Sequence, residues 1–206
     1  QQQGLVRRGL SMGWHTYRDE YARPEDLAEA MADLDPDVQT SVPWLWRLMD
    51  PASDVCKATG EEIWKLWNQD WEFGGLERYN VFSDCDRETA GPWFLGSMIA
   101  ARAFALQDDY ERVSTIIRWT DREFLGCGWS ERISRAHAVD DPWRHVHEVL
   151  NWPGGEYLML VYRESAGLYP TPEGLRISPH LAPDFAGLTI TNFKYRDLRY
   201  NIRYTG

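Results

Sequence analysis

One stretch of the chain is apolar around nearly its whole helical circumference, and this feature limits the folds open to it. Residues 92–107 read PWFLGSMIAARAFALQ, with a single charged residue among aliphatic, aromatic and small side chains. A helix that is apolar on most faces is normally buried on most faces. The chain therefore needs further helices around this one, and Pro92 suits the first position of the central helix.

Other segments have the spacing expected of those neighbouring helices. Apolar residues three and four positions apart predict helices over 24–34, 35–50, 108–124 and 146–165. The segment 108–124 follows the central helix after a short turn, which predicts an antiparallel helical hairpin. A further helix is predicted to begin at Thr59, where Thr59 and Glu62 fit a capping box, and to end at Gly74–Gly75.

The period of the sequence changes after Leu168. The last residues, GLTITNFKYRDLRYNIRYTG, alternate β-branched and aromatic side chains with polar ones, and Arg196–Asp197 marks a turn. We expect two or three strands that pair with a sheet or pack on the helices, since an isolated hairpin is marginal in water. The predicted fold is mostly α with a C-terminal β segment. Its parts are an irregular segment 1–24, helical hairpins over 25–168 and the β segment 169–206.

The charge and the cysteines exclude several classes of protein. The net charge is −10, from 32 acidic and 22 basic residues, and such a surface repels nucleic-acid phosphates and anionic membranes. No apolar run reaches the ~18 residues of a membrane span. The three cysteines form no CxxC pair, and the three histidines between 137 and 147 are interpreted as part of a solvated loop. We expect no metal, no cofactor, no nucleic acid and no membrane partner.

Aromatic residues are 14% of the chain, with 11 Trp and 10 Tyr, and these types often line sites for amphipathic ligands. The segment GGLERYNVFSDCDRETAGPWFL gathers Arg78, Tyr79, Asp84 and Trp93 near one loop. A guanidinium donor, a carboxylate acceptor and aromatic faces are the groups that bind a hydroxyl-rich ring. An Arg–Asp pair that only holds the loop together is the alternative interpretation.

A second loop carries a candidate acid/base group. Glu131 lies in GWSERIS beside Trp129, and Trp152 follows in NWPGGEYL. A carboxylate among aromatic side chains tends to have a shifted pKa, which suits acid/base chemistry. An exposed Glu131 paired with Arg132 or Arg135 is the alternative interpretation.

These motifs, in this order, resemble the glucoamylase-like enzymes of glycoside hydrolase family 15, which belong to the six-hairpin glycosidases. The resemblance covers roughly residues 36–165 and rests on GGxxRY, GPWFLG and SER followed by NWPGGEYL. It implies an (α/α)6 barrel with the site in loops at one end, and acid/base hydrolysis of short α-glucosides. It also implies a role for each candidate residue: Glu131 as general base, Arg78, Tyr79 and Asp84 as sugar-binding groups, and Trp93, Trp129 and Trp152 as pocket walls.

The sequence departs from the family in two places. The motif of the general acid has no counterpart in residues 1–77, and residues 174–206 look like the β segment of the related disaccharide phosphorylases. Twelve helices with their loops need about 200 residues, whereas only six are predicted here. We therefore expect the chain to be the C-terminal portion of a larger glycosidase, whose N-terminal part is its partner. Phosphorolysis and a non-catalytic carbohydrate-binding helical protein are the alternatives.

Overall fold

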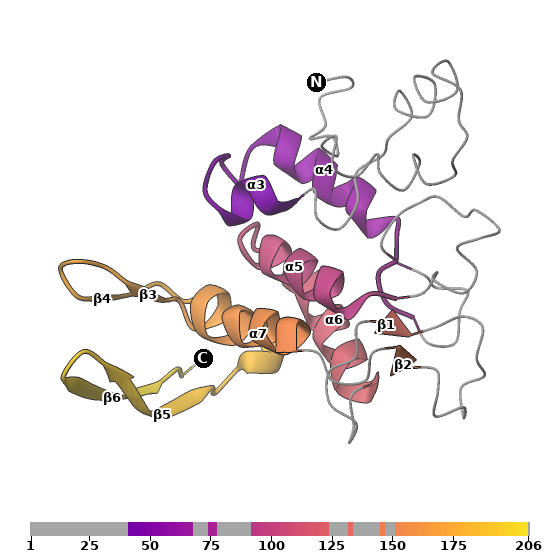
Figure 1. The fold of residues 1–206 in the computed structure, drawn as a ribbon. Coiled ribbons are helices and arrows are strands. Elements are labelled where there is room, and N and C mark those ends of the chain that lie inside the picture. Colours follow the sequence, from indigo (N-terminus) through magenta and orange to yellow (C-terminus); the bar gives the residue numbers. More distant parts are fainter. Residues whose placement is uncertain are drawn as a thin grey trace, which may run out of the picture.

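The computed structural model describes residues 41–67, 74–77, 92–123, 132–133, 145–146 and 151–205. Helix α5 (Phe94–Ala105) lies at the centre of this part of the chain, between α4 (Asp54–Trp64) and α7 (Asn151–Met159) (Figure 1). Ten of the twelve residues of α5 are buried. This burial confirms the prediction that the apolar stretch forms a central helix.

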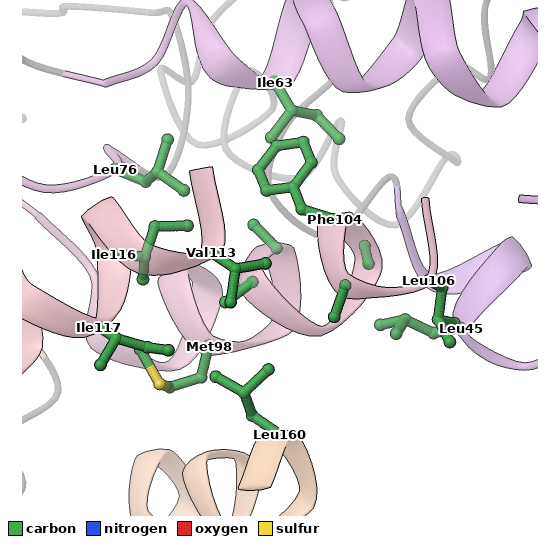
Figure 2. Close-up of a cluster of buried hydrophobic side chains, with 14 of the residues drawn as sticks. Leu45, Ile63, Leu76, Met98, Phe104, Leu106, Val113, Ile116, Ile117 and Leu160 are labelled. Atoms are coloured by element: carbon green, nitrogen blue, oxygen red, sulfur yellow. The ribbon is translucent and has the colours of Figure 1, made fainter. Parts of the chain in front are cut away.

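The core is built from side chains of several helices that meet on α5 (Figure 2). Phe104 of α5 lies beside Ile63 of α4, and Met98 of α5 points toward Leu160, the first residue of the π-helical segment η5 (Leu160–Ser165). Helix α6 (Tyr110–Glu123) contributes Val113, Ile116 and Ile117. Helix α6 contacts α5 after a short turn, so the predicted pairing of these two helices is confirmed.

Aromatic stacking accounts for several of the tryptophans. The ring of Phe94 stacks on Trp119 with the centroids 4.6 Å apart, and Trp67 meets Trp119 edge-on at 6.2 Å. Trp64 in turn stacks on Trp67 at 5.0 Å. Such pairs stabilise a core beyond the area that they bury. Part of the high tryptophan content therefore serves packing between α4 and α6.

The start of α4 differs from the prediction. Ser53 is the N-cap, and its hydroxyl accepts a hydrogen bond from the backbone N–H of Cys56. Thr59, predicted as the cap, lies inside the helix, where its hydroxyl donates to a carbonyl one turn earlier. The helix ends at Trp64 rather than at Gly74–Gly75. Ser53 lacks the glutamate of a capping box, since Cys56 stands three positions later, but it is a favoured N-cap residue and is followed by Asp54 in the first turn.

Two further helix boundaries were predicted wrongly. Pro92 is not the first residue of α5, because it lies opposite Glu77 in an antiparallel bridge and the helix begins only at Phe94. The predicted helix 35–50 is reduced to α3 (Val42–Leu45) within the described residues. The backbone turns left-handed at Arg47, with φ 60°, which prevents the helix from continuing.

The C-terminal part forms four strands rather than two or three. Strand β3 (Leu168–Pro170) pairs with β4 (Leu175–Ile177), and β5 (Thr189–Tyr195) pairs with β6 (Leu198–Arg203), both antiparallel. The turn between β5 and β6 lies at residues 196–197, as predicted. The additional hairpin was missed because its strands have only three residues each and prolines surround their turn.

Both hairpins extend to one side of the helices (Figure 1) and share a small apolar cluster. Ile190 and Tyr204 pack against Ala166 and Leu168, and the Tyr204 hydroxyl donates to the Ala166 carbonyl. A 3-10 turn, η6 (Pro183–Phe185), precedes β5 and contacts α6. Through these contacts the hairpins meet the end of η5, and η6 meets α6.

The larger architecture stays a prediction. Segment 1–24 and the helix predicted over 24–34 lie outside the described residues. The (α/α)6 barrel and the domain boundaries at residues 24 and 168 likewise stay predictions. Among the described helices, none is both long and apolar enough to cross a membrane.

Candidate functional site

The first predicted sugar-binding loop starts and finishes at one place in the fold. Glu77, the last described residue before the loop, lies opposite Pro92, the first described residue after it. The backbone N–H of Trp93 donates to the Leu76 carbonyl at 2.9 Å, and that of Glu77 donates to the Leu66 carbonyl at 3.0 Å. The segment 78–91 is therefore closed by paired backbone at its base.

The second predicted loop comes to the same base. The backbone N–H of Ile133 donates to the carbonyl of Pro92 at 3.0 Å. Ile133 belongs to β1 (Arg132–Ile133), which pairs antiparallel with β2 (His145–Val146). Glu131 directly precedes β1 in the sequence. The described backbone thus joins the bases of both loops, although about forty residues separate them along the chain.

This junction lies where α5 begins. Trp93 is the N-cap of α5, and β1 and β2 lie on the same side of the molecule as the first residues of α5 and α7 (Figure 1). The two C-terminal hairpins lie on the opposite side. We call the side that holds Trp93, β1, β2 and the start of α7 the loop end.

Two of the seven candidate residues are described, and both lie at the loop end. Trp93 is only 5% exposed and packs in the core, whereas Trp152 on α7 is 68% exposed. A ligand could stack on the open indole of Trp152 but could reach only an edge of Trp93. The other candidates lie outside the described residues: Arg78, Tyr79, Asp84, Trp129 and Glu131.

A buried ionic cluster, which the sequence analysis did not single out, links α5 to α7 and η5. Arg102 donates from Nε and Nη2 to Oε1 of Glu164, at 3.2 and 2.9 Å. Its Nη1 forms an ion pair with Oε2 of Glu156. Tyr169 donates from its hydroxyl to Oε2 of Glu164 at 3.2 Å. One guanidinium therefore holds two carboxylates, and Arg163, whose Nε lies 3.8 Å from Oε1 of Glu164, brings the formal charge of the cluster to zero.

The members of the cluster differ in their exposure. The side chain of Glu164 is 1% exposed, while that of Glu156 is 27% exposed. Burial and the Glu164 carboxylate raise the pKa of Tyr169, which keeps the phenol protonated as a hydrogen-bond donor. The arrangement presents the Glu156 carboxylate at the surface while its Oε2 atom is fixed from below.

The π-helical segment explains how two glutamates reach one arginine. In an α-helix each residue turns by about 100°, so positions eight apart differ by about 80°. The turns of η5 are wider, which reduces the rotation per residue. Glu156 on α7 and Glu164 on η5 can therefore face the same guanidinium.

A signal for this cluster was present in the sequence. Arg102 is the only charged residue of the apolar stretch 92–107, and a buried charge requires a charged or strongly hydrogen-bonding partner. Its partners lie more than fifty positions later, so the chain order alone did not identify them.

Metal chemistry has no support from the described part of the chain. Among these residues, no group of three His, Cys, Asp or Glu side chains could hold a metal ion. Cys56 is a free, buried thiol of α4. Cys85, Cys127, His137 and His147 lie outside the described residues.

Comparison of the chain with protein-family models, with curated proteins and with solved structures finds no match. The resemblance to the glucoamylase-like enzymes therefore stays a prediction from the sequence motifs.

Proposed function

We propose that this chain is part of a glucoamylase-like glycoside hydrolase that cleaves short α-glucosides by acid/base catalysis. The observation that carries the proposal is the hydrogen bond between Ile133 and Pro92. It joins the base of the loop that contains Arg78 to the strand that directly follows Glu131. Residues that bind and hydrolyse one sugar must come together, and this contact is compatible with that requirement.

In the proposed reaction, Glu131 removes a proton from a water molecule that attacks the anomeric carbon of the terminal sugar. The glycosidic bond breaks, and the leaving oxygen takes a proton from a general acid. We expect that acid in the N-terminal part of the same enzyme, the proposed partner of this chain. An inverting mechanism would place the two carboxyl groups ~6.5–9.5 Å apart, with room for the water.

The remaining candidates hold the substrate. Arg78, Tyr79 and Asp84 are proposed to bind the hydroxyls of the terminal sugar. Trp93, Trp129 and Trp152 are proposed as the apolar walls, and the exposure of Trp152 supports a direct contact for that residue.

The test is Glu131→Gln in the gene product that contains this chain, with maltotriose as substrate. We expect hydrolysis to fall by at least about 10²-fold, since the amide cannot act as a base, while maltotriose still binds. Glu62→Gln is the control, because Glu62 forms an exposed pair with Lys65 on α4. Undiminished hydrolysis by Glu131→Gln would remove Glu131 from the mechanism.

The same assay separates the alternatives. Turnover that requires inorganic phosphate and yields a sugar phosphate would indicate phosphorolysis. Binding of maltotriose without any turnover would indicate a carbohydrate-binding protein.

A further inference from the structure

An exposed aromatic residue and a fixed carboxylate lie one helical turn apart on α7. Trp152 and Glu156 are four positions apart, so their side chains lie on the same side of the helix. The indole is 68% exposed, and the carboxylate-bearing side chain is partly exposed. Such a pair offers a flat apolar face next to a strong hydrogen-bond acceptor.

The Glu156 carboxylate is held in place from below. Arg102 binds its Oε2 atom, and Arg102 is itself fixed by two hydrogen bonds to Glu164. Among the described residues, no hydrogen bond to the Oε1 atom of Glu156 occurs. A carboxylate that is fixed through one oxygen can accept a ligand hydroxyl at the other without a large loss of side-chain entropy.

The surface next to this pair is open. A Cβ atom built at Gly155 would have no described neighbour within 4 Å. The glycine therefore places no side chain beside the indole of Trp152, three positions earlier on the helix.

We propose that Trp152 and Glu156 form a sugar-binding subsite on α7, in which the indole stacks on a pyranose ring and Glu156 Oε1 accepts a hydroxyl hydrogen bond. The choice of an α-glucoside as the sugar rests on the proposed function. A neutral ligand suits the site better than a cation, because the guanidinium of Arg102 already binds the same carboxylate and would repel a second positive charge. Glu156 thereby becomes a specificity-determining residue besides those of the two loops.

The experiment measures the dissociation constant of maltotriose by calorimetry, with the gene product that contains this chain. Glu156→Gln removes the charged acceptor and should weaken binding by about tenfold to hundredfold. Glu164→Gln is the matched control, because Glu164 binds the same arginine but is too buried to touch a ligand. We expect Glu164→Gln to lower the melting temperature and, because it only loosens Arg102, to weaken maltotriose binding less than Glu156→Gln does.

A second variant, at Trp152, tests the subsite without changing any residue of the ionic cluster. Trp152→Ala removes an exposed ring, so it should leave the melting temperature unchanged and weaken maltotriose binding by about tenfold. Tetramethylammonium chloride serves as the cationic probe and should not compete with maltotriose.

Several outcomes would overturn the subsite: wild-type affinity of Glu156→Gln, equal weakening by Glu164→Gln, no binding of maltotriose by the wild type, or competition by tetramethylammonium. Its failure is distinguishable from that of the proposed function. Wild-type affinity of Glu156→Gln together with loss of hydrolysis in Glu131→Gln would reject only the subsite. Binding that depends on Glu156 without any hydrolysis would reject only the enzyme.

Discussion

Arg102 donates two hydrogen bonds to a single oxygen of Glu164, across 62 positions of the chain. The contact ties the central helix α5 to the π-helical end of α7, and both side chains are almost completely buried. Buried charges of this kind depend on each other, because the loss of one leaves the other in a largely apolar interior with fewer partners: Glu156 for Arg102, and Arg163 for Glu164.

Removal of the arginine should therefore be costly. Arg102→Met leaves the buried Glu164 carboxylate with only the Tyr169 hydroxyl and the more distant Arg163, and we expect the free energy of unfolding to fall by about 3–5 kcal/mol. Urea unfolding measures the change. Lys65→Met, which breaks an exposed pair with Glu62, is the control and should cost less than about 1 kcal/mol. A similar fall in the free energy of unfolding for both variants would contradict the claim that the buried Arg102 contributes more to stability than the exposed Lys65.

Two glycines should respond to alanine with opposite signs. Gly75 has φ 96°, and a Cβ there would lie 2.5 Å from the Pro92 side chain and 2.6 Å from the Trp119 ring. Gly75→Ala should destabilise by about 1–3 kcal/mol. Gly155→Ala should stabilise by about 0.5–1 kcal/mol, because Gly155 is helical and a Cβ there meets nothing. Thermal unfolding distinguishes them, and a stabilising Gly75→Ala would be incompatible with this packing.

Substitutions of Ser53 and Thr59 test which of the two residues caps α4. Ser53→Ala removes the hydroxyl that accepts from Cys56 and should cost about 1 kcal/mol. Thr59→Ser keeps a hydroxyl for the bond to Val55 and should cost less than Ser53→Ala. Chemical denaturation of both variants provides the comparison. A larger loss for Thr59→Ser would instead favour a helix that starts at Thr59.

Tyr110 should make stability depend on pH in the alkaline range. Burial, together with the hydrogen bond to Asp108, raises the pKa of Tyr110 from 10.0 to about 12. Between these values the unfolded phenol loses its proton while the folded one keeps it, so ionisation favours unfolding. The stabilisation is complete below pH 10 and is lost as the pH rises to about 12.

The measurement compares the wild type with Tyr110→Phe, which lacks the ionising group. The difference in free energy of unfolding should shift in favour of Tyr110→Phe as the pH rises through this range. Asp108→Asn should lower the pKa of Tyr110 toward its ordinary value, as followed by tyrosinate absorbance, because the amide carries no negative charge. An unchanged titration in Asp108→Asn would exclude the contribution of that carboxylate.

Arg78 is expected to act on substrate binding. Arg78→Ala should raise KM for maltotriose more than it lowers kcat, because the proposed contact is made to the terminal sugar in both ground and transition state. Arg118→Ala is the control, since Arg118 belongs to neither predicted loop and pairs with Asp184 of η6. An unchanged kcat/KM in Arg78→Ala would show that the pocket was assigned to the wrong loop.

The sequence correctly predicted those helices and turns whose conformation is determined by residues close to them in the chain. The apolar circumference of 94–105 and the periodicity of 110–123 both correspond to helices of the structure. The turn at 196–197 was recognisable for the same reason. These features are determined within a few residues, so the order of the chain contains the necessary information.

Features that depend on distant partners could not be predicted in this way. Pro92 was wrongly assigned to a helix, because proline suits the first position of a helix. Its actual partner, Glu77, lies on the far side of a loop and could not be identified from the neighbouring residues. The partners of Arg102 were missed because a π-helical segment brings Glu164 to the same place as Glu156. Of the candidate site, Trp152 alone could be evaluated as an open aromatic surface, and it has the exposure that a stacking role requires.

Glu77 and Pro92 lie opposite each other in an antiparallel bridge, so the segment 78–91 begins and ends at the same place. The whole segment can therefore be replaced by another loop. Its two ends are fixed to each other and to β1, so a change of length within it need not displace α4 or α5. Loops mounted in this way can diverge in sequence while their scaffold is conserved by its packing. Replacement of this loop between Glu77 and Pro92 should therefore leave the packing of α4 against α5 intact.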